Sequence, residues 1–441
     1  MSFAARKIAV IGAGWAGCAA AMELARRGHA VTLLEAARTL GGRARRVEVD
    51  GRLLDNGQHI LLGAYRESLR LMRLAGIDTG ASLLRLPLQI RYPEGSGGMD
   101  FTAARLPAPW HMAAGLLRAR GLGRADKLAL ARFSTTARWI GWRLDTDCTV
   151  ADMLERYDQT ERLVRLMWRP LCIAALNTVP ERASAQVFLN VLRDSLGANR
   201  AASDMLVPRT DLSALFPEQA ARYVRGHGGS VRCGAAVTGL SRDGARWRLE
   251  IAGQAEAEAC DRVVLAVHPG QVARLAGGFW KNGPLPALEH EPITTCYLQY
   301  APSLRLQGPM FALPEDPARQ AYGQFVFDRG HLVPAEAGLL AVVVSTAEAA
   351  LAAGHEALGR ALAAQLAQAF GMPALEQPQW TRLISEKRAT FSCTPALRRP
   401  PNASGVPGLA IAGDYTEGDY PATLEGAVRS GMAAARLVSE G

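Results

Sequence analysis

Residues 8–35 constrain the fold of this chain more strongly than any other segment. The apolar run at 8–11 predicts a buried strand, 16–27 predicts a helix, and 31–34 predicts a second strand. Gly28 suits the end of that helix, where a left-handed residue is common. Together these segments predict a βαβ unit, in which a helix connects two parallel strands.

The turn between the first strand and the helix has the spacing of a dinucleotide-binding loop. Its first glycine permits a tight turn, its second lets a pyrophosphate approach, and its third lets the helix pack closely on the strand. The free amides at the start of the helix would face the phosphates. Glu35, which ends the second strand, is placed to accept hydrogen bonds from the adenosine ribose. The loop residues expected to contact or support the cofactor are Gly12, Gly14, Trp15, Ala16 and Gly17.

Two further segments favour FAD over NAD. In Gly41-Gly42-Arg43 the glycines let the backbone pass close to the cofactor, and the Arg43 guanidinium can pair with the diphosphate or lie beside the flavin. Near the C-terminus a strand at 409–412 leads to Gly413 and Asp414, and Asp414 can hold ribityl or phosphate-side hydroxyls. A helix follows, and its start at Thr423 and Leu424 would direct its positive end at the pyrimidine edge of the flavin.

The expected fold class is α/β, with a Rossmann-type FAD-binding domain and a discontinuous substrate domain. Further cofactor-domain strands are expected near Val231, near Val237 and at 263–267. Backbone groups at Val237 could contact the adenine, although an ordinary buried valine is the alternative. The expected boundaries are 1–75, 215–275 and 395–441 for the FAD-binding domain, and 76–214 and 276–394 for the substrate domain.

The substrate domain is expected to combine helices with an antiparallel sheet. Helices should dominate residues 105–205. In the second part of the domain, residues 276–394, the sequence pattern predicts four strands and a helix. The strands are expected at 294–300, 322–327, 339–345 and 379–387, and the helix at 348–370. We expect this sheet to cover the flavin. We also expect a long apolar tunnel between the two domains.

The net charge of +9 is concentrated in one segment. Residues 101–144 hold eight basic residues against the single acid Asp126, together with bulky apolar residues such as Trp110 and Trp139. One interpretation is peripheral contact of residues 105–143 with an anionic membrane surface, and the other is a pair of core-facing helices with a solvated basic face. Nucleic acid is not expected as a partner because no binding motif accompanies the charge.

The seven cysteines are scattered and form no CxxC pair, which favours a reducing compartment without disulfides or a metal site. No uninterrupted apolar stretch is long enough to span a bilayer. The expected location is therefore the cytoplasm, with contact at the inner face of the cytoplasmic membrane if the basic segment binds lipid.

The motifs at Gly12–Gly17, Glu35, Gly41–Arg43 and Gly413–Gly431 resemble those of the flavin amine oxidase and carotenoid desaturase superfamily. More narrowly, the chain resembles the hydroxysqualene dehydroxylases, the squalene-associated desaturase-like branch, across most of its length. The segments that carry this resemblance are 54–63, 176–180, 386–391 and 420–426.

The resemblance implies an amine-oxidase-like fold and an enzyme of squalene and hopanoid biosynthesis. Its reaction would remove the hydroxyl of hydroxysqualene reductively, giving squalene and water, with reduced FAD as the immediate donor and an unidentified electron donor behind it. Because that hydroxyl is allylic, its departure as water would leave a delocalised cation that a hydride can quench. A carotenoid-type desaturase, an amine oxidase and a lipid-binding protein that retains FAD for stability are the alternatives.

Several residues are candidates for chemistry at the flavin. His59 is the first candidate for proton donation or substrate orientation, and a simple contact with the flavin or backbone is the alternative. Asp55 could orient His59 or cap a turn, and Gly57 and Gln58 could contact the flavin edge. Lys387 is a candidate by the resemblance, because related amine oxidases hold a lysine near flavin N5; a structural ion pair is the alternative. Tyr420 could close the pocket or belong to an ordinary turn.

Overall fold

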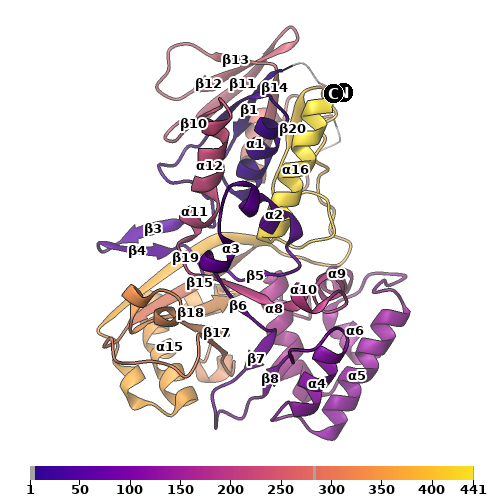
Figure 1. The fold of residues 1–441 in the computed structure, drawn as a ribbon, viewed down its shortest axis with the longest axis vertical. Helices are drawn as coiled ribbons and strands as arrows, with labels where there is room; N and C mark the ends of the chain where they lie inside the picture. Colours follow the sequence, from indigo (N-terminus) through magenta and orange to yellow (C-terminus); the bar gives the residue numbers. More distant parts are fainter. Residues whose placement is uncertain (1–4, 282–284, 441) are drawn as a thin grey trace.

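The computed structural model describes residues 5–281 and 285–440, so the expected domain segments at 1–4, 282–284 and 441 lie outside the described residues. The nucleotide-binding part forms one end of the molecule, and the other end divides into a sheet region and a helical region (Figure 1). The long strand β19 (Trp380–Phe391) runs from the sheet region towards the nucleotide-binding part. The fold is α/β, as the sequence predicts.

A five-stranded parallel sheet forms the centre of the nucleotide-binding part. Its strands come from distant parts of the chain, and every neighbouring pair is parallel. In spatial order they are β10 (Ser230–Arg232), β2 (Ala30–Leu34), β1 (Lys7–Ile11), β14 (Arg262–Leu265) and β20 (Leu409–Ile411). The βαβ unit and the C-terminal strand predicted from the sequence are thus confirmed, whereas the domain boundaries themselves remain predictions.

Small residues let the helices of this part approach one another closely. Helix α1 (Trp15–Arg26) packs against α16 (Leu424–Glu440) and α12 (Pro217–Gly226). A Cβ at Gly17 would collide with the carbonyl oxygen of Gly12, and one at Gly431 would collide with the α1 backbone. The glycine spacing therefore fixes how near the helices lie to each other and to the sheet.

The second large sheet is antiparallel and lies in the substrate part. Its spatial order is β16 (Met310–Ala312), β17 (Phe325–Asp328), β18 (Leu339–Ser345), β15 (His290–Gln299) and β19. Four of these strands were predicted, and the short β16 was not. The helix expected at 348–370 is divided into α14 (Glu348–Leu351) and α15 (His355–Phe370), because Gly354 adopts a positive φ of 86°.

Helices dominate the first part of the substrate region, as predicted. They are α4 (Trp110–Arg118), α5 (Arg124–Trp139), α6 (Val150–Arg156), α7 (Glu161–Leu163), the π-helical turn η1 (Val164–Trp168), α8 (Arg169–Leu176), α9 (Ala185–Ser195) and α10 (Arg200–Ser203). Trp168, Phe188 and Phe133 are buried in the core between these helices.

Shorter elements connect the two parts. Three small sheets are built from β3 (Arg46–Val49) with β4 (Arg52–Asp55), from β5 (Leu61–Leu62), β9 (Met205–Pro208) and β6 (Leu83–Leu86), and from β7 (Gln89–Arg91) with β8 (Asp100–Thr102). A three-stranded sheet of β11 (Val237–Asp243), β12 (Arg246–Ile251) and β13 (Glu258–Cys260) flanks the parallel sheet. The remaining helices are α2 (Arg66–Leu74), α3 (Thr79–Ser82), α11 (Leu212–Leu215), α13 (Pro269–Ala276) and the short turns η2 (Pro317–Arg319), η3 (Arg329–His331), η4 (Pro334–Glu336) and η5 (Pro373–Glu376).

Candidate functional site

A cavity of about 550 Å³ lies at the carboxyl ends of the parallel strands, where ligands bind in open α/β sheets. We call it the cofactor cavity. It runs from the start of α1 to the start of α16 and meets the substrate part at β19. It brings together thirteen of the residues expected at the cofactor: Gly12, Gly14, Trp15, Ala16, Glu35, Gly42, Arg43, His59, Val237, Gly413, Asp414, Thr423 and Leu424.

The first glycine of the loop makes the tight turn that the sequence predicts. Gly12 has a φ of 98°, and a Cβ there would collide with the carbonyl oxygen of Ala266. The turn is held against the second glycine segment because the Gly41 amide donates to the Ala13 carbonyl at 2.9 Å. The two glycine segments therefore form one continuous wall of the cavity.

Glu35 lies at the end of β2 and is fixed by backbone amides. Its carboxylate accepts hydrogen bonds from the Ala13 amide at 2.7 Å and the Ala37 amide at 2.9 Å. Both oxygens are thereby held at the cavity wall, where each keeps a lone pair for a further donor. This arrangement suits a ribose with two hydroxyl donors.

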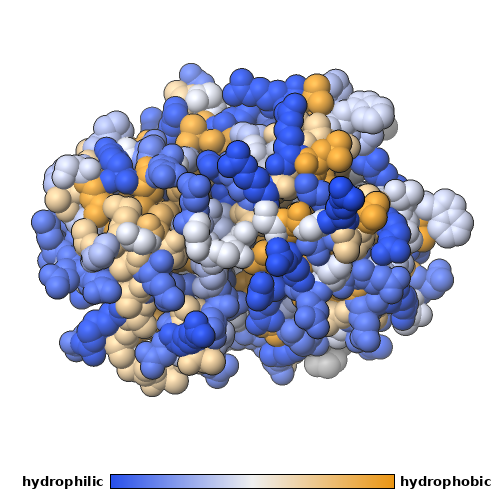
Figure 2. Space-filling view, turned by 90° about the horizontal axis from the view of Figure 1, so that it is seen from below, coloured by the Kyte–Doolittle hydropathy of each residue, from blue (hydrophilic) through white to orange (hydrophobic). Residues whose placement is uncertain are grey.

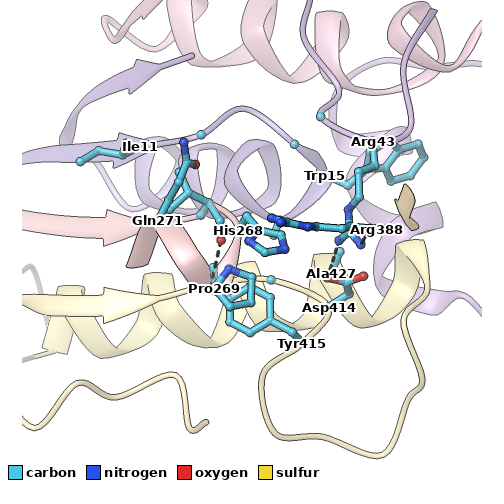
Figure 3. A pocket seen from close by; sticks show the side chains of 18 of the residues that line it. Ile11, Trp15, Arg43, His268, Pro269, Gln271, Arg388, Asp414, Tyr415 and Ala427 are labelled. Atoms are coloured by element: carbon cyan, nitrogen blue, oxygen red, sulfur yellow. Dashed lines mark hydrogen bonds and ion pairs between the residues drawn. The ribbon is translucent and has the colours of Figure 1, made fainter. Parts of the chain in front are cut away.

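Arg43 and Asp414 join the N-terminal and C-terminal segments across the cofactor cavity. The Arg43 guanidinium lies 2.6 Å from Asp414 Oδ1, and its other nitrogen donates to the Ala389 carbonyl at 2.6 Å. Figure 3 shows Arg43 and Asp414 extending towards each other inside the cavity. Burial alone would lower the pKa of Arg43, but the Asp414 carboxylate raises it, so the guanidinium stays charged.

The residues present fit FAD. Trp15 lines the cavity, and its indole Nε1 is buried with no hydrogen-bond partner among the described residues. The α1 N-terminus suits the pyrophosphate, Glu35 suits the adenosine ribose, and the α16 start at Thr423 suits the flavin. These groups are spread along one elongated cavity, as a dinucleotide requires.

His59 lines the cofactor cavity, whereas the preceding residues Gly57 and Gln58 do not. Its Nδ1 lies 3.0 Å from the Gly57 carbonyl, and burial lowers the pKa of His59 below the usual histidine value. Gln58 instead donates to the Tyr297 hydroxyl at 2.9 Å and accepts from Arg329 at 3.2 Å. Neither Gln58 nor Gly57 lines the cofactor cavity, and Gly17 also lies outside its lining because it packs against Gly12.

Asp55 does not contact His59. Its Oδ1 accepts a hydrogen bond from the Leu212 amide at 2.8 Å, and its backbone carbonyl accepts one from Tyr297. Burial raises the pKa of Asp55 to about 7, against the lowering effect of the Leu212 amide. Of the two roles expected for Asp55, the structure thus shows the local cap: it ties β4 to the start of α11.

Lys387 points away from the cofactor cavity, and its neighbours line it. Glu386 and Arg388 both belong to the lining, and Lys387 is exposed. The reason is the irregular register of β19 against β15 near Glu386, where the pairing shifts and the sequence pattern no longer fixes the face. The basic residue that the strand presents to the cofactor cavity is therefore Arg388 and not Lys387.

Two histidines in the cavity were not among the expected residues. His268 follows β14 and His290 begins β15, and their ring centroids lie 5.1 Å apart. Burial lowers the pKa of each below the usual histidine value, and Arg43 and Arg388 add to the effect. His268 could have been found from its position, since residues that follow parallel strands meet at one sheet edge.

A second cavity adjoins the first in the substrate part, and we call it the apolar cavity. Thr423 lines both cavities. The apolar cavity is walled by aliphatic and aromatic side chains from α8, α9, β7, β16, β17 and β18. They include Ile60, Ile90, Leu171, Phe188, Leu192, Met310, Phe325, Phe327 and Val343. Its apolar walls would suit a hydrocarbon, and it adjoins the end of the cofactor cavity at the start of α16.

The fold and the cofactor cavity define a flavin-dependent oxidoreductase. The flavin-containing amine oxidoreductase family matches residues 15–439, and this chain belongs to that family. Its cofactor is FAD, and it is an enzyme of the FAD-dependent oxidoreductase class.

Individual relatives narrow the comparison. The chain is 30% identical to the hydroxysqualene dehydroxylase of Rhodopseudomonas palustris, over 98% of each chain. It is 24% identical to the zeta-carotene desaturase of a Synechocystis species, over 98% of this chain and 97% of the other. A solved oxidoreductase from Methanosarcina mazei has the same fold, with a TM-score of 0.74, 15% identity and coverage of 98% and 100%. The predicted resemblance to hydroxysqualene dehydroxylases is confirmed.

Within residues 5–281 and 285–440, no cluster of three histidine, cysteine or acidic side chains could hold a metal ion. Among the described helices, none is both long enough and apolar enough to cross a bilayer.

Proposed function

We propose that this enzyme removes the hydroxyl group of hydroxysqualene reductively and releases squalene and water, in squalene or hopanoid biosynthesis. The observation that carries the proposal is the apolar cavity, which meets the cofactor cavity at Thr423. The end-to-end similarity to a hydroxysqualene dehydroxylase supports it.

The chain's own residues would bind the two reactants at adjoining sites. Glu35, the α1 N-terminus and Arg43 would hold FAD, which supplies a hydride when it is bound and reduced. Residues such as Leu171, Phe188 and Phe327 would surround the isoprenoid chain and exclude water. Water exclusion matters because an allylic cation would otherwise be captured by solvent.

Anaerobic turnover tests this proposal directly. Purified, chemically reduced protein is mixed with hydroxysqualene, flavin absorbance is followed, and products are identified by mass spectrometry. Squalene should appear in step with reoxidised flavin. If a competent flavin stays reduced and no squalene forms, the proposal is wrong.

A carotenoid-type desaturase is the second candidate, because a zeta-carotene desaturase is similar over nearly the full chain. It would use oxidised flavin and a polyene precursor in the same apolar cavity, so new double bonds in the product would identify it. An amine oxidase would instead reduce its flavin with an amine. A lipid-binding protein would hold a flavin that none of these substrates reduces or reoxidises.

We also propose that residues 105–143 bind the anionic inner face of the cytoplasmic membrane. Among the described residues, seven large apolar side chains are exposed, and five of them lie in this segment: Leu106, Trp110, Leu117, Leu128 and Trp139. Figure 2 shows apolar groups between strongly hydrophilic ones on the face seen from below, the end at which α4 and α5 lie in Figure 1. Apolar groups that insert and basic groups that meet lipid phosphates are the two components of interfacial binding.

The position of this segment suits delivery of a lipid. Helix α4 packs on β8, β8 pairs with β7, and β7 contributes Gln89 and Ile90 to the apolar cavity. Vesicle co-sedimentation tests the contact: the protein should bind anionic vesicles, and neutralising Arg118, Arg120, Arg124 and Lys127 should weaken that binding. Binding that does not respond to the substitutions would contradict the proposal.

A further inference from the structure

Tyr420 and Asp194 form a hydrogen-bonded polar pair in the wall of the apolar cavity. Tyr420 Oη donates to Asp194 Oδ2 at 2.8 Å, and both residues line the cavity. Tyr420 precedes α16, and Asp194 lies in the last turn of α9. Among the described residues that line this cavity, Asp194 is the one that is acidic or basic, so its charge in a wall of neutral side chains needs an explanation.

The two groups differ in protonation. Burial alone would raise the pKa of Asp194, but the hydrogen bonds from Arg193 and Tyr420 lower it overall, so Asp194 is a carboxylate at neutral pH. Burial raises the pKa of the Tyr420 phenol well above its usual value, so Tyr420 keeps its proton. The pair therefore presents a hydrogen-bond donor, Tyr420, beside an acceptor, Asp194.

The Arg429 cation lies over the ring of Tyr420. The Arg429 guanidinium lies 4.3 Å from the Tyr420 ring centroid, and its Nη2 is 3.4 Å from Tyr420 Oη. Arg429 is held by Glu425 at 2.8 Å, and Glu425 is itself fully buried and bonded to Ser68. A preorganised positive charge at this place stabilises negative charge that develops on the phenol oxygen.

The pair also lies next to the junction of the two cavities. Tyr420 is three residues before Thr423, which lines both cavities. The Tyr65 ring, whose hydroxyl is bonded to Thr423, lies 6.3 Å from the Tyr420 ring in an edge-on arrangement. A group bound at Tyr420 and Asp194 would thus be at the end of the apolar cavity that faces the flavin position.

We infer that Tyr420 and Asp194 bind the hydroxyl group of the isoprenoid alcohol and that Tyr420 supplies the proton with which it leaves. This inference rests on the proposed dehydroxylation. A hydroxyl is both donor and acceptor, so it can insert between the pair, donating to Asp194 and accepting from Tyr420. A saturated or unsaturated hydrocarbon has no such group, which explains why a site for hydroxysqualene needs a polar pair here.

The proton and electron balance closes with these residues. When the C–O bond breaks, its electron pair remains on oxygen, the Tyr420 proton joins that oxygen, and water leaves. FAD, when bound and reduced, would supply the hydride that reduces the carbon, and the phenolate formed beside Arg429 would regain its proton from solvent. During the step, the Asp194 carboxylate beside the departing hydroxyl would stabilise the positive charge that develops on the carbon.

The test separates binding of the alcohol from binding of the hydrocarbon. With oxidised flavoprotein, the affinities for hydroxysqualene and squalene are measured from the change in flavin absorbance. Tyr420→Phe removes one oxygen and should weaken hydroxysqualene binding about tenfold while leaving squalene binding within about twofold, as expected for one lost hydrogen bond. Reduced Tyr420→Phe should also form squalene at least about 100-fold more slowly, the usual contribution of a general acid.

The matched control is Tyr157→Phe, which removes a phenol oxygen from a residue that lines neither cavity. It should behave as the unmodified enzyme in both assays. If Tyr420→Phe loses its flavin or unfolds, two other measurements are used. The first is the affinity of Asp194→Asn for hydroxysqualene, and the second is the affinity of the unmodified enzyme for the methyl ether of hydroxysqualene. The ether lacks the donor for Asp194, so the unmodified enzyme should bind it at least about tenfold more weakly than the alcohol.

The outcomes distinguish this inference from the proposed function. If the unmodified reduced enzyme forms no squalene, the proposed function is wrong and the inference falls with it. If the unmodified enzyme forms squalene and Tyr420→Phe does so equally fast with an unchanged alcohol preference, only the inference is wrong. Unchanged affinity for the methyl ether would overturn it in the same way.

Discussion

Arg43 and Asp414, 371 positions apart in the sequence, form a 2.6 Å ion pair across the cofactor cavity. Asp414 is 8% exposed, whereas Arg43 is 40% exposed, so removing Arg43 would leave a largely buried carboxylate without its partner. Arg43→Met should therefore destabilise the protein by about 1–3 kcal/mol, less than the ~3–5 kcal/mol of a fully buried pair. It should also lower the fraction of purified protein that retains FAD.

The double variant Arg43→Met/Asp414→Asn provides the control. Because the uncompensated carboxylate is then absent, its loss of stability should be smaller than the sum of the two single losses. Denaturant unfolding of the flavin-free proteins measures this coupling. Strictly additive losses would show that the pair contributes nothing to stability.

Asp55 should make stability depend on pH in the direction opposite to most acidic residues. Its pKa is about 7 in the folded protein because of burial, against a usual 3.8. The folded state therefore binds more protons than the unfolded state between these values, and the free energy of unfolding should fall as pH rises from about 4 to about 7. The effect is at most about 4 kcal/mol.

Asp55→Asn should remove this contribution, since the amide oxygen can still accept from the Leu212 amide and carries no charge. Unfolding experiments at pH 5 and pH 8 should show a smaller loss of stability at pH 8 for Asp55→Asn than for the unmodified enzyme. Exposed Asp145→Asn serves as the control. An unchanged pH dependence in Asp55→Asn would mean that other groups cause it.

His59 should contribute to binding of the cofactor more than to proton transfer. It lines the cofactor cavity and not the apolar cavity, and its lowered pKa keeps the imidazole neutral at pH 7. His59→Ala should weaken FAD binding about tenfold, while turnover per bound flavin changes by less than about threefold. Turnover is measured with excess FAD, and a large loss at full flavin occupancy would return His59 to the role of proton donor.

The exposed tryptophans of the basic segment should anchor the protein to lipid. Trp139 is 86% exposed and Trp110 is 66% exposed, values unusual for such large apolar side chains. Trp110→Ser/Trp139→Ser should reduce binding to anionic vesicles about tenfold or more without lowering the melting temperature, since neither side chain is in the core. Trp168 is left unchanged in this variant because it is buried in the core, where its loss would lower the melting temperature. Equal vesicle binding by the double variant would argue against insertion.

The sequence predicted the cofactor cavity well because local chemistry determines it. Gly12 needs a positive φ, and Glu35 needs only to end the second strand, so their spacing along the chain specifies their place in space. The cofactor loop and the C-terminal segment meet because parallel strands expose their carboxyl ends at one edge of the sheet.

The catalytic side was less predictable because it depends on contacts between distant elements. Lys387 and Arg388 differ by one position in β19, and the shifted register against β15 decides which faces the cofactor. Asp194 lies in a helix without a recognisable motif. Its proposed role can be inferred only from its hydrogen bond to Tyr420, which the structure shows. The sequence pattern of one segment does not show which residues of a distant segment it will contact.

The order of strands in the parallel sheet also bears on how the protein is made. β14 has β1 on one side and β20 on the other, and β20 begins at Leu409. A ribosome that adds about 5–20 residues per second needs roughly 20–80 seconds to reach that strand. Until then, the edge of β14 that pairs with β20 and the apolar surface that α16 covers are exposed and can bind other polypeptide chains. The nascent enzyme should thus depend on chaperones until β20 and α16 have left the ribosome.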